Sequence, residues 1–128
     1  MKVLTIKQPW ASLIVNGYKE YEFRSWKTSY RGKILIHAGK SIEKEALKKF
    51  SNYELDNTLG AIVGEAEIVD CILVDERLDK KLRKIDKLVY GNDHRGIYAW
   101  KLINIKKYKK PIVINGKLGL WNYDIDSK

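Results

Sequence analysis

The sequence predicts an α+β fold: a small β-barrel, or a strongly curved sheet, with a few short flanking helices. Segments rich in β-forming residues outnumber the segments with helical periodicity. They do not alternate regularly with helices, as the strands of a parallel α/β sheet would. The chain has 128 residues, a length typical of one small domain. We therefore expect a single domain over residues 1–128.

The first expected elements are a strand and a helix, which meet at a proline. Residues 2–6, KVLTI, are rich in β-forming residues and predict a strand. Pro9 suits the first turn of a helix. Three apolar residues follow at the i, i+3 and i+4 spacing of a helix: Trp10, Leu13 and Ile14. Gly17 is then placed to end this helix.

Two more strands and a second helix are expected next. Residues 19–25 predict a strand, and residues 33–38, KILIHA, predict another. Residues 41–50 carry acidic residues early and lysines late, which is the charge order that stabilises a helix. Ser41 is a suitable N-cap for that helix.

The second half of the chain predicts further strands around one charged helix. Residues 61–74, AIVGEAEIVDCILV, predict a long strand that is bent or bulged near Gly64. Residues 75–89 are charged and place four apolar residues at helical spacing. Residues 98–105 predict a strand, and residues 111–114, PIVI, predict a short edge strand.

The charge of the chain favours an anionic partner. It has 25 Lys and Arg against 16 Asp and Glu, which gives a net charge of +9. Such a balance favours phosphate-rich or otherwise anionic partners, of which RNA or another nucleic acid is one class. The single Cys71 excludes an internal disulfide and a cysteine-rich zinc site. No His, Cys or Asp cluster has metal-ligand spacing, so we expect neither a metal nor a cofactor.

Nothing in the hydropathy pattern indicates a membrane protein. No apolar run approaches the roughly 20 residues that span a bilayer. At the N-terminus, Lys7, Gln8 and Pro9 interrupt the apolar run that a signal peptide needs. We therefore expect a cytoplasmic protein without membrane association.

The densest group of chemically useful side chains lies in residues 17–24, GYKEYEFR. If this segment continues as a strand, Glu22, Arg24 and Trp26 share one face. Arg24 suits bidentate contacts to a phosphate or a base edge, and Lys19 supplies a mobile positive charge. Glu22 could orient Arg24 or accept a hydrogen bond from a base amino group. An ordinary solvent-facing ion pair, worth little to stability, is an equal alternative.

The two histidines are weaker candidates. His37 and Lys40 lie at the end of a β-rich segment, and His94 lies in the polar loop 91–96. An imidazole titrates near neutrality, so His37 could act as a general base or bind a phosphate. A buried, hydrogen-bonded histidine is an equal interpretation. The two histidines could also form an acid–base pair for RNA cleavage, provided that the fold brings them together.

Two lysine-rich runs, residues 80–84 and 106–110, form the strongest basic clusters. Aromatic residues lie among or near them: Tyr90, Tyr98 and Tyr108. Tyrosine rings beside lysines could stack on unpaired bases of a single-stranded RNA. The alternative is a solvated lysine-rich face without a specific partner.

Residues 17–24 also contain Gly17-x-Lys19-x-x-Glu22-x-Arg24, which matches the G-x-K-x-x-E-x-R signature of the ASCH domain. ASCH stands for activating signal cointegrator homology. Further segments resemble the same family over nearly the whole chain: Gln8-Pro9-Trp10-Ala11, Arg31-Gly32, His37-Ala38, Gly60 to Gly64 and Gly116 to Trp121. The resemblance implies a PUA-like β-barrel that binds RNA or another nucleic acid in RNA processing or transcription. It also implies a cleft between barrel and helices beside the Lys-Glu-Arg signature.

Some members of the wider family are enzymes, which adds a hydrolase to the alternatives. One is a small amidohydrolase that deacetylates N4-acetylcytidine, and others are described as ribonucleases. The amidohydrolase pattern keeps the lysine and the arginine but has a threonine at the position of Glu22. A hydroxyl beside a lysine can serve as an activated nucleophile, whereas a carboxylate suits a general base or an orienting group.

Three functions therefore stay open. The leading one is an RNA-binding module with a nucleotide-sized cleft, for which the expected contact residues are Lys19, Glu22, Arg24, Trp26, His37 and Lys40. The second is a hydrolase acting on RNA or a modified nucleoside, with Lys19 and Glu22 as the catalytic acid–base pair. The third is a protein-interaction module whose basic surface binds an acidic protein partner.

Overall fold

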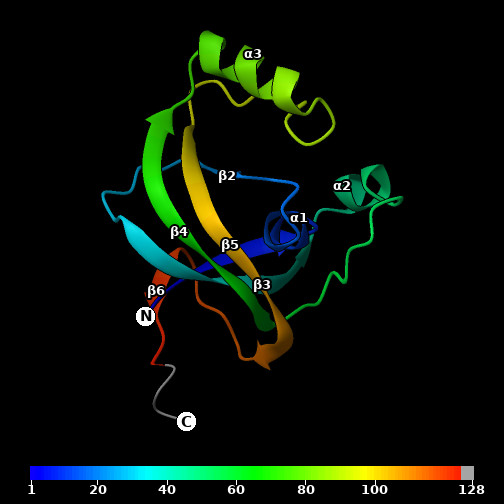
Figure 1. The fold of residues 1–128 in the computed structure, drawn as a ribbon, viewed down its shortest axis with the longest axis vertical. Helices are drawn as coiled ribbons and strands as arrows, with labels where there is room; N and C mark the ends of the chain where they lie inside the picture. The colour runs from blue at the N-terminus through cyan, green and yellow to red at the C-terminus, as the bar shows by residue number, and fades with distance from the viewer. Residues whose placement is uncertain (125–128) are drawn as a thin grey trace.

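The computed structural model describes residues 1–124 and contains one mixed six-stranded sheet with three helices (Figure 1). The last four residues of the expected domain lie outside the described residues. The strands are β1 Lys2–Gln8, β2 Tyr21–Arg24, β3 Gly32–Ile42, β4 Ala61–Leu73, β5 Tyr98–Val113 and β6 Leu120–Asn122. The helices are α1 Trp10–Val15, α2 Lys44–Lys49 and α3 Glu76–Ile85. The predicted α+β class is confirmed.

The strands lie in the order β2-β5-β4-β3-β1-β6. Neighbours are antiparallel except for β1 and β3, which are parallel. The long strands β4 and β5 curve strongly across the molecule (Figure 1). Their pairing shifts register at several points, and such bulges bend a strand and increase its twist. The sheet therefore curls in the manner of a barrel.

The bend in β4 occurs near Gly64, as predicted. The register of β4 shifts against β5 between Ile62 and Gly64. A Cβ atom at Gly64 would collide with the carbonyl oxygen of Lys106 and lie 2.7 Å from Cγ1 of Val15. Only glycine allows β4, β5 and α1 to approach this closely.

Backbone hydrogen bonds do not close the sheet, because β2 and β6 stand at its two ends. A side chain instead spans part of the gap. Nη2 of Arg24, at the end of β2, donates a hydrogen bond of 2.6 Å to the carbonyl oxygen of Thr5 in β1. The structure is thus barrel-like in curvature and open in its backbone pairing, and Arg24 links two of its separated strands.

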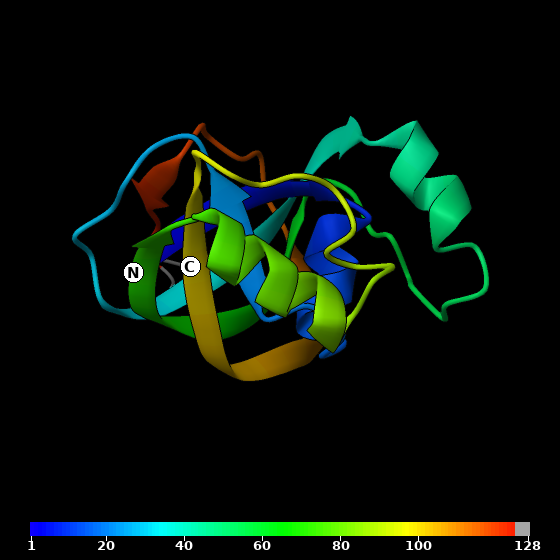
Figure 2. The ribbon, with the colours of Figure 1, turned by 90° about the horizontal axis from the view of Figure 1, so that it is seen from above.

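The helices cover different parts of the sheet. Five of the six residues of α1 are buried, and Ala11, Ile14 and Val15 pack into the main core. A second apolar cluster joins all three helical regions through Leu13, Phe50, Leu82, Val89 and Tyr90. From above, α3 lies across the ends of the long strands, while α2 lies to one side (Figure 2).

Three details differ from the sequence prediction. Ser41 is not a helix cap, because β3 continues through it to Ile42 and Glu43 is the N-cap of α2. Residues 111–114 do not form a separate edge strand, since β5 runs unbroken through Pro111 to Val113 and pairs there with β4. The short strand β6, for which the sequence predicted no strand, pairs with β1.

No helix among residues 1–124 has both the length and the apolar character to cross a membrane.

Replacing Gly64 with alanine tests the close packing at the bend of β4. We expect Gly64→Ala to lower the free energy of unfolding by about 1–3 kcal/mol, because the new methyl group overpacks against fixed backbone. Gly39→Ala is a matched control, since its Cβ would meet a threonine methyl group at 3.0 Å and a backbone carbonyl oxygen no closer than 3.9 Å. Urea unfolding measures both. Equal unfolding midpoints for the two variants would contradict the packing argument.

Candidate functional site

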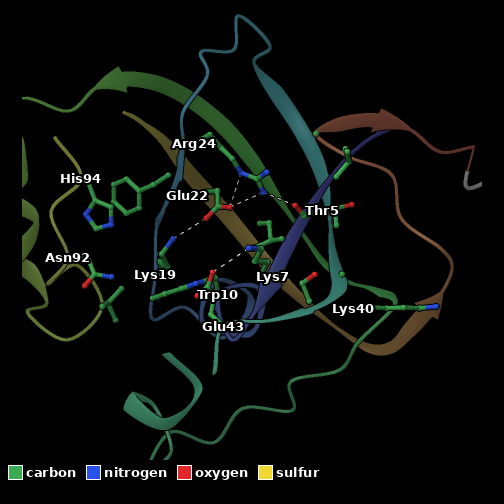
Figure 3. Close-up of a pocket in the computed structure, with 17 residues that line it drawn as sticks. Thr5, Lys7, Trp10, Lys19, Glu22, Arg24, Lys40, Glu43, Asn92 and His94 are labelled. Carbon is green, nitrogen blue, oxygen red and sulfur yellow. Dashed lines mark hydrogen bonds and ion pairs between the residues drawn. The ribbon is translucent and has the colours of Figure 1, made fainter. Parts of the chain in front are cut away.

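A cavity of about 560 Å³ opens beside the signature residues (Figure 3). Its walls come from β1, β2, the end of β3, the start of α1, the loop after α3 and the loop before β6. A volume of this size falls in the range typical of small-ligand sites, which is roughly 300–1,000 Å³. The cavity is therefore large enough for a nucleotide.

A carboxylate between two cations lies at the centre of one wall (Figure 3). Lys19 Nζ donates a hydrogen bond of 3.2 Å to Oε1 of Glu22. Arg24 Nε donates one of 3.0 Å to Oε2, and Nη2 of Arg24 lies 2.9 Å from the same oxygen. The side chains of Lys19 and Glu22 are 4% and 9% exposed. Both oxygens of a buried carboxylate are thus paired with positive charge.

The turn after α1 places Lys19 beside Glu22. Gly17 has a φ of +84°, a conformation that glycine adopts at little cost. The backbone N–H groups of Tyr18 and Lys19 both donate to the carbonyl oxygen of Leu13, which ends the helix. The Lys19 side chain then folds back, so that Nζ donates a hydrogen bond of 2.6 Å to the carbonyl oxygen of Tyr21.

Lys19 has an unusually apolar environment for an ammonium group. Its Nζ lies 5.4 Å from the ring centroid of Trp10 and 5.0 Å from that of Phe23. Burial lowers the pKa of Lys19, and Glu22 opposes this effect by favouring the charged form. The two acceptors named above leave one of the three ammonium N–H donors for a ligand.

The guanidinium group of Arg24 is held in place by contacts within the protein. The sequence predicted bidentate contacts from Arg24 to a phosphate or a base. In the structure, Nε and Nη2 already bind Glu22 and the backbone of Thr5. Its remaining terminal nitrogen, Nη1, takes no part in these hydrogen bonds. Arg24 thus combines a structural bridge with one donor group for a ligand.

The other predicted contact residues have different positions. Lys40 lines the cavity, although its ammonium group points away from the other labelled side chains (Figure 3). Trp26 lies outside the cavity wall and packs edge-on against Trp100, at a centroid distance of 4.7 Å. Strand alternation does not extend to Trp26, because β2 ends at Arg24.

His37 is also outside the cavity wall and is 1% exposed. Its Nε2 lies 2.7 Å from the carbonyl oxygen of Ile114, so this nitrogen is the donor. Its Nδ1 lies 3.3 Å from Oγ1 of Thr5, which itself accepts a hydrogen bond from Nε1 of Trp121. This arrangement matches the alternative of a buried, hydrogen-bonded histidine. His37 does not converge with His94, because only His94 lines the cavity.

Sequence reasoning missed several parts of the wall. Sequence patterns placed Trp10 in an apolar helical stripe, and they did not single out Phe23. Both border the cavity, as do Lys7 and Glu43, which form an ion pair of 3.4 Å at its rim. The local pattern could have identified Trp10 only through its position as the first residue of α1, the helix that leads to the signature.

Metal binding has no support from the described part of the chain. Among residues 1–124, no three or more His, Cys, Asp or Glu side chains converge as metal ligands would.

Comparisons with known proteins concern the family of the chain and its fold. The family model described as "ASCH domain" matches residues 4–112. Activating signal cointegrator 1 from Homo sapiens is 35% identical over 81 residues, and the protein of the same name from Mus musculus has the same identity over the same length. Each match covers 54% of this chain and only 14% of the relative, so the similarity concerns a small part of those longer proteins.

Solved structures support the fold. The crystal structure of ASCH from Zymomonas mobilis superposes with a TM-score of 0.64, covering 98% of this chain and 88% of that one, at 14% sequence identity. A mutant of the same protein gives a TM-score of 0.61 at 16% identity, over 98% of this chain and 91% of its own. At such identity the likeness concerns the PUA-like α+β fold alone. Together with the family match over most of the sequence, it shows that the chain belongs to the ASCH domain family.

Proposed function

We propose that this chain binds RNA and that its cavity receives one nucleotide of a single-stranded segment. The observation that carries the proposal is the Lys19–Glu22–Arg24 group on the wall of a nucleotide-sized cavity, in which Lys19 and Glu22 are buried and Arg24 is partly buried. Because these charges already hold one another in place, little ordering is needed when a ligand binds. Membership in a PUA-like family associated with RNA supports the same conclusion.

The wall supplies complementary chemistry for a nucleotide. Lys19 and Arg24 each keep a donor that suits a phosphate or a base carbonyl oxygen. The rings of Trp10 and Phe23 provide apolar surface beside these donors, on which a base could pack. The site therefore resembles other small-ligand sites, in which a few polar groups are set among apolar walls.

The remaining positive charge surrounds this site more diffusely. Lysines 106, 107, 109 and 110 of β5 are exposed, and so are several lysines of α3. One of them, Lys107, is paired with Asp56 at 2.6 Å. Exposed lysines of this kind attract the RNA backbone without reading its sequence. We propose a role in RNA processing or transcription regulation for a protein with this division of charge.

A hydrolase acting on RNA or a modified nucleoside is the second candidate. The lowered pKa of Lys19, caused by burial, favours a lysine that exchanges protons more readily than an exposed one. The carboxylate of Glu22 lies within hydrogen-bond distance of that lysine. In this case Lys19 and Glu22 would be the acid–base pair, and no hydroxyl nucleophile occupies the position of Glu22.

Removing the Lys19 charge tests the RNA-binding site. Methionine has a similar length and tolerates the apolar pocket, so Lys19→Met should fold while losing its donor. Because a hydrogen bond to a charged group is worth about 1.5–3 kcal/mol, we expect roughly 10- to 100-fold weaker binding. Fluorescence anisotropy with a labelled single-stranded oligoribonucleotide measures this change. The exposed Lys81→Met has the same change in net charge and should alter the affinity by about twofold or less. Equal affinities for the two variants would refute this location of the site.

The protonation of Lys19 gives a prediction for stability. Because its pKa is lowered on folding, the unfolded chain binds more protons than the folded one between the lowered pKa and 10.5. The free energy of unfolding contributed by this group therefore rises with pH in that window. We expect the stability difference between wild type and Lys19→Met to shift in favour of wild type as pH increases toward about 10. Urea unfolding over this range measures it, and a difference independent of pH would contradict the lowered pKa.

Incubation with substrates separates binding from hydrolysis. If the chain is a hydrolase, the purified protein should release product from RNA or from N4-acetylcytidine, and Glu22→Gln should abolish that release. Chromatography of the reaction mixture measures the product. Product formation that survives Glu22→Gln would argue against Glu22 as the base, and its absence in wild type would argue against the hydrolase.

A further inference from the structure

A second pair of polar side chains, one from α3 and one from the loop that follows it, lies at the cavity, and the loop residue lines it. His94 lines the cavity, on the same side as Lys19 and Asn92 (Figure 3). Behind it lies Asp79, which is only 1% exposed. Neither residue belongs to the Lys-Glu-Arg signature, and the binding site described above gives Asp79 no role.

Asp79 is a buried carboxylate with incomplete pairing. Its Oδ2 lies 3.0 Å from Nη2 of Arg83 without hydrogen-bond geometry. Its Oδ1 accepts a hydrogen bond of 3.3 Å from the backbone N–H of His94. The same Oδ1 lies 3.9 Å from Nδ1 of the His94 ring. A buried carboxylate costs free energy unless it is paired, so the nearby imidazole of His94 is a candidate partner for Asp79.

The ring of His94 has a fixed plane. It stacks on Phe23, with centroids 3.7 Å apart and an angle of 15° between the planes. Its Nδ1 is buried and makes no hydrogen bond. Nδ1 is the buried nitrogen of a ring that lines the cavity, which leaves Nε2 as the ring nitrogen for a ligand. The 3.9 Å gap to Asp79 is about 1 Å longer than a hydrogen bond, so a small shift of the ring closes it.

We propose that Asp79 holds His94 as the neutral tautomer with its proton on Nδ1, and that Nε2 of His94 accepts a hydrogen bond from the bound nucleotide. This inference rests on the proposed RNA-binding function and adds a contact on a second wall of the cavity. The matching ligand group is a donor, either an amino or imino group of a base or the 2′-hydroxyl of ribose. His94 is then the ligand contact, and Asp79 is a positioning residue.

The charges around His94 favour its neutral form. Lys19 and Arg83 repel a positive imidazole, while Asp79 and Asp93 attract one. Burial has the largest effect, and together these influences lower the pKa of His94 below its ordinary value of 6.5. At neutral pH the ring is therefore an acceptor at Nε2. Protonation at lower pH converts that acceptor into a donor, which no longer matches the ligand group.

The pH dependence of RNA affinity tests the proposal. The probe is a fluorescent oligoribonucleotide of about ten nucleotides with random sequence, at fixed ionic strength between about pH 5 and pH 8. We expect wild-type affinity to fall as the pH decreases through the pKa of His94. His94→Leu should weaken binding about tenfold at the upper pH, and His94→Gln should recover part of the loss through its amide oxygen. Both variants should lose this pH dependence.

Nuclear magnetic resonance distinguishes a ligand contact by His94 from a purely structural role of this residue. The chain has two histidines, and the signals absent from His94→Gln belong to His94. The ¹⁵N shifts should show the proton on Nδ1, and Asp79→Asn should reduce the preference for that tautomer. RNA binding should lower the pKa of His94 further, because the ligand binds the neutral form. A proton on Nε2, or a pKa that rises on binding, would overturn the proposal.

The variants also separate this inference from the proposed function. If Lys19→Met weakens RNA binding while His94→Leu does not, the site stands and the His94 contact is wrong. Affinity that strengthens on acidification in wild type alone would show a phosphate contact by charged His94, which also overturns the proposal. If wild type binds no oligonucleotide, both fail. Comparison with a random-sequence DNA oligonucleotide of the same length identifies the group that donates to His94. DNA lacks the 2′-hydroxyl, so a contact to that hydroxyl is lost with DNA, whereas a contact to a base amino or imino group is kept.

Discussion

The carboxylate of Glu22 is the group on which both the site and the closure of the sheet depend. A buried carboxylate is costly unless positive charge and hydrogen bonds compensate it. Lys19 and Arg24 supply both, one at each oxygen. Arg24 then uses its outer nitrogen to hold the backbone of Thr5 in β1. The ion group that offers donors to the cavity therefore also ties β2 to β1, across the side where the sheet has no backbone pairing.

This dual role distinguishes the Lys19–Glu22–Arg24 group from the other charges on the chain. The net charge of +9 attracts polyanions in general, and surface lysines contribute to it without fixed positions. Some of that charge is already offset by local pairs, such as Lys33 with Glu65 at 2.9 Å. The Lys19–Glu22–Arg24 group keeps a fixed geometry because each member is constrained by the fold. In the function that we propose, long-range attraction and selective contact thus belong to different residues.

Local sequence patterns predicted the parts of the fold that depend on residues close together in the sequence. Glycine at position 17, the helix before it and the strand after it follow from spacing, and they placed Lys19 and Glu22 near one another. The patterns failed where tertiary contacts decide. Strand alternation was extended to Trp26, although β2 ends two residues earlier. The three-residue strand β6 exists only because β1 offers a free edge, which no local signal reveals.

The same limit explains why the sequence analysis named His94 as a candidate but did not pair it with Asp79. They are 15 residues apart, on a helix and on a later loop, and only the packing of α3 brings them together. That packing is coupled to the signature itself. The hydroxyl of Tyr90 accepts a hydrogen bond of 2.8 Å from the backbone N–H of Glu20, and burial raises the pKa of Tyr90 to about 12, so it stays protonated. Tyr90 also packs edge-on against Phe23, the ring on which His94 stacks. A displacement of the loop after α3 would therefore disturb the backbone beside Lys19, so the two walls of the cavity hold their geometry jointly.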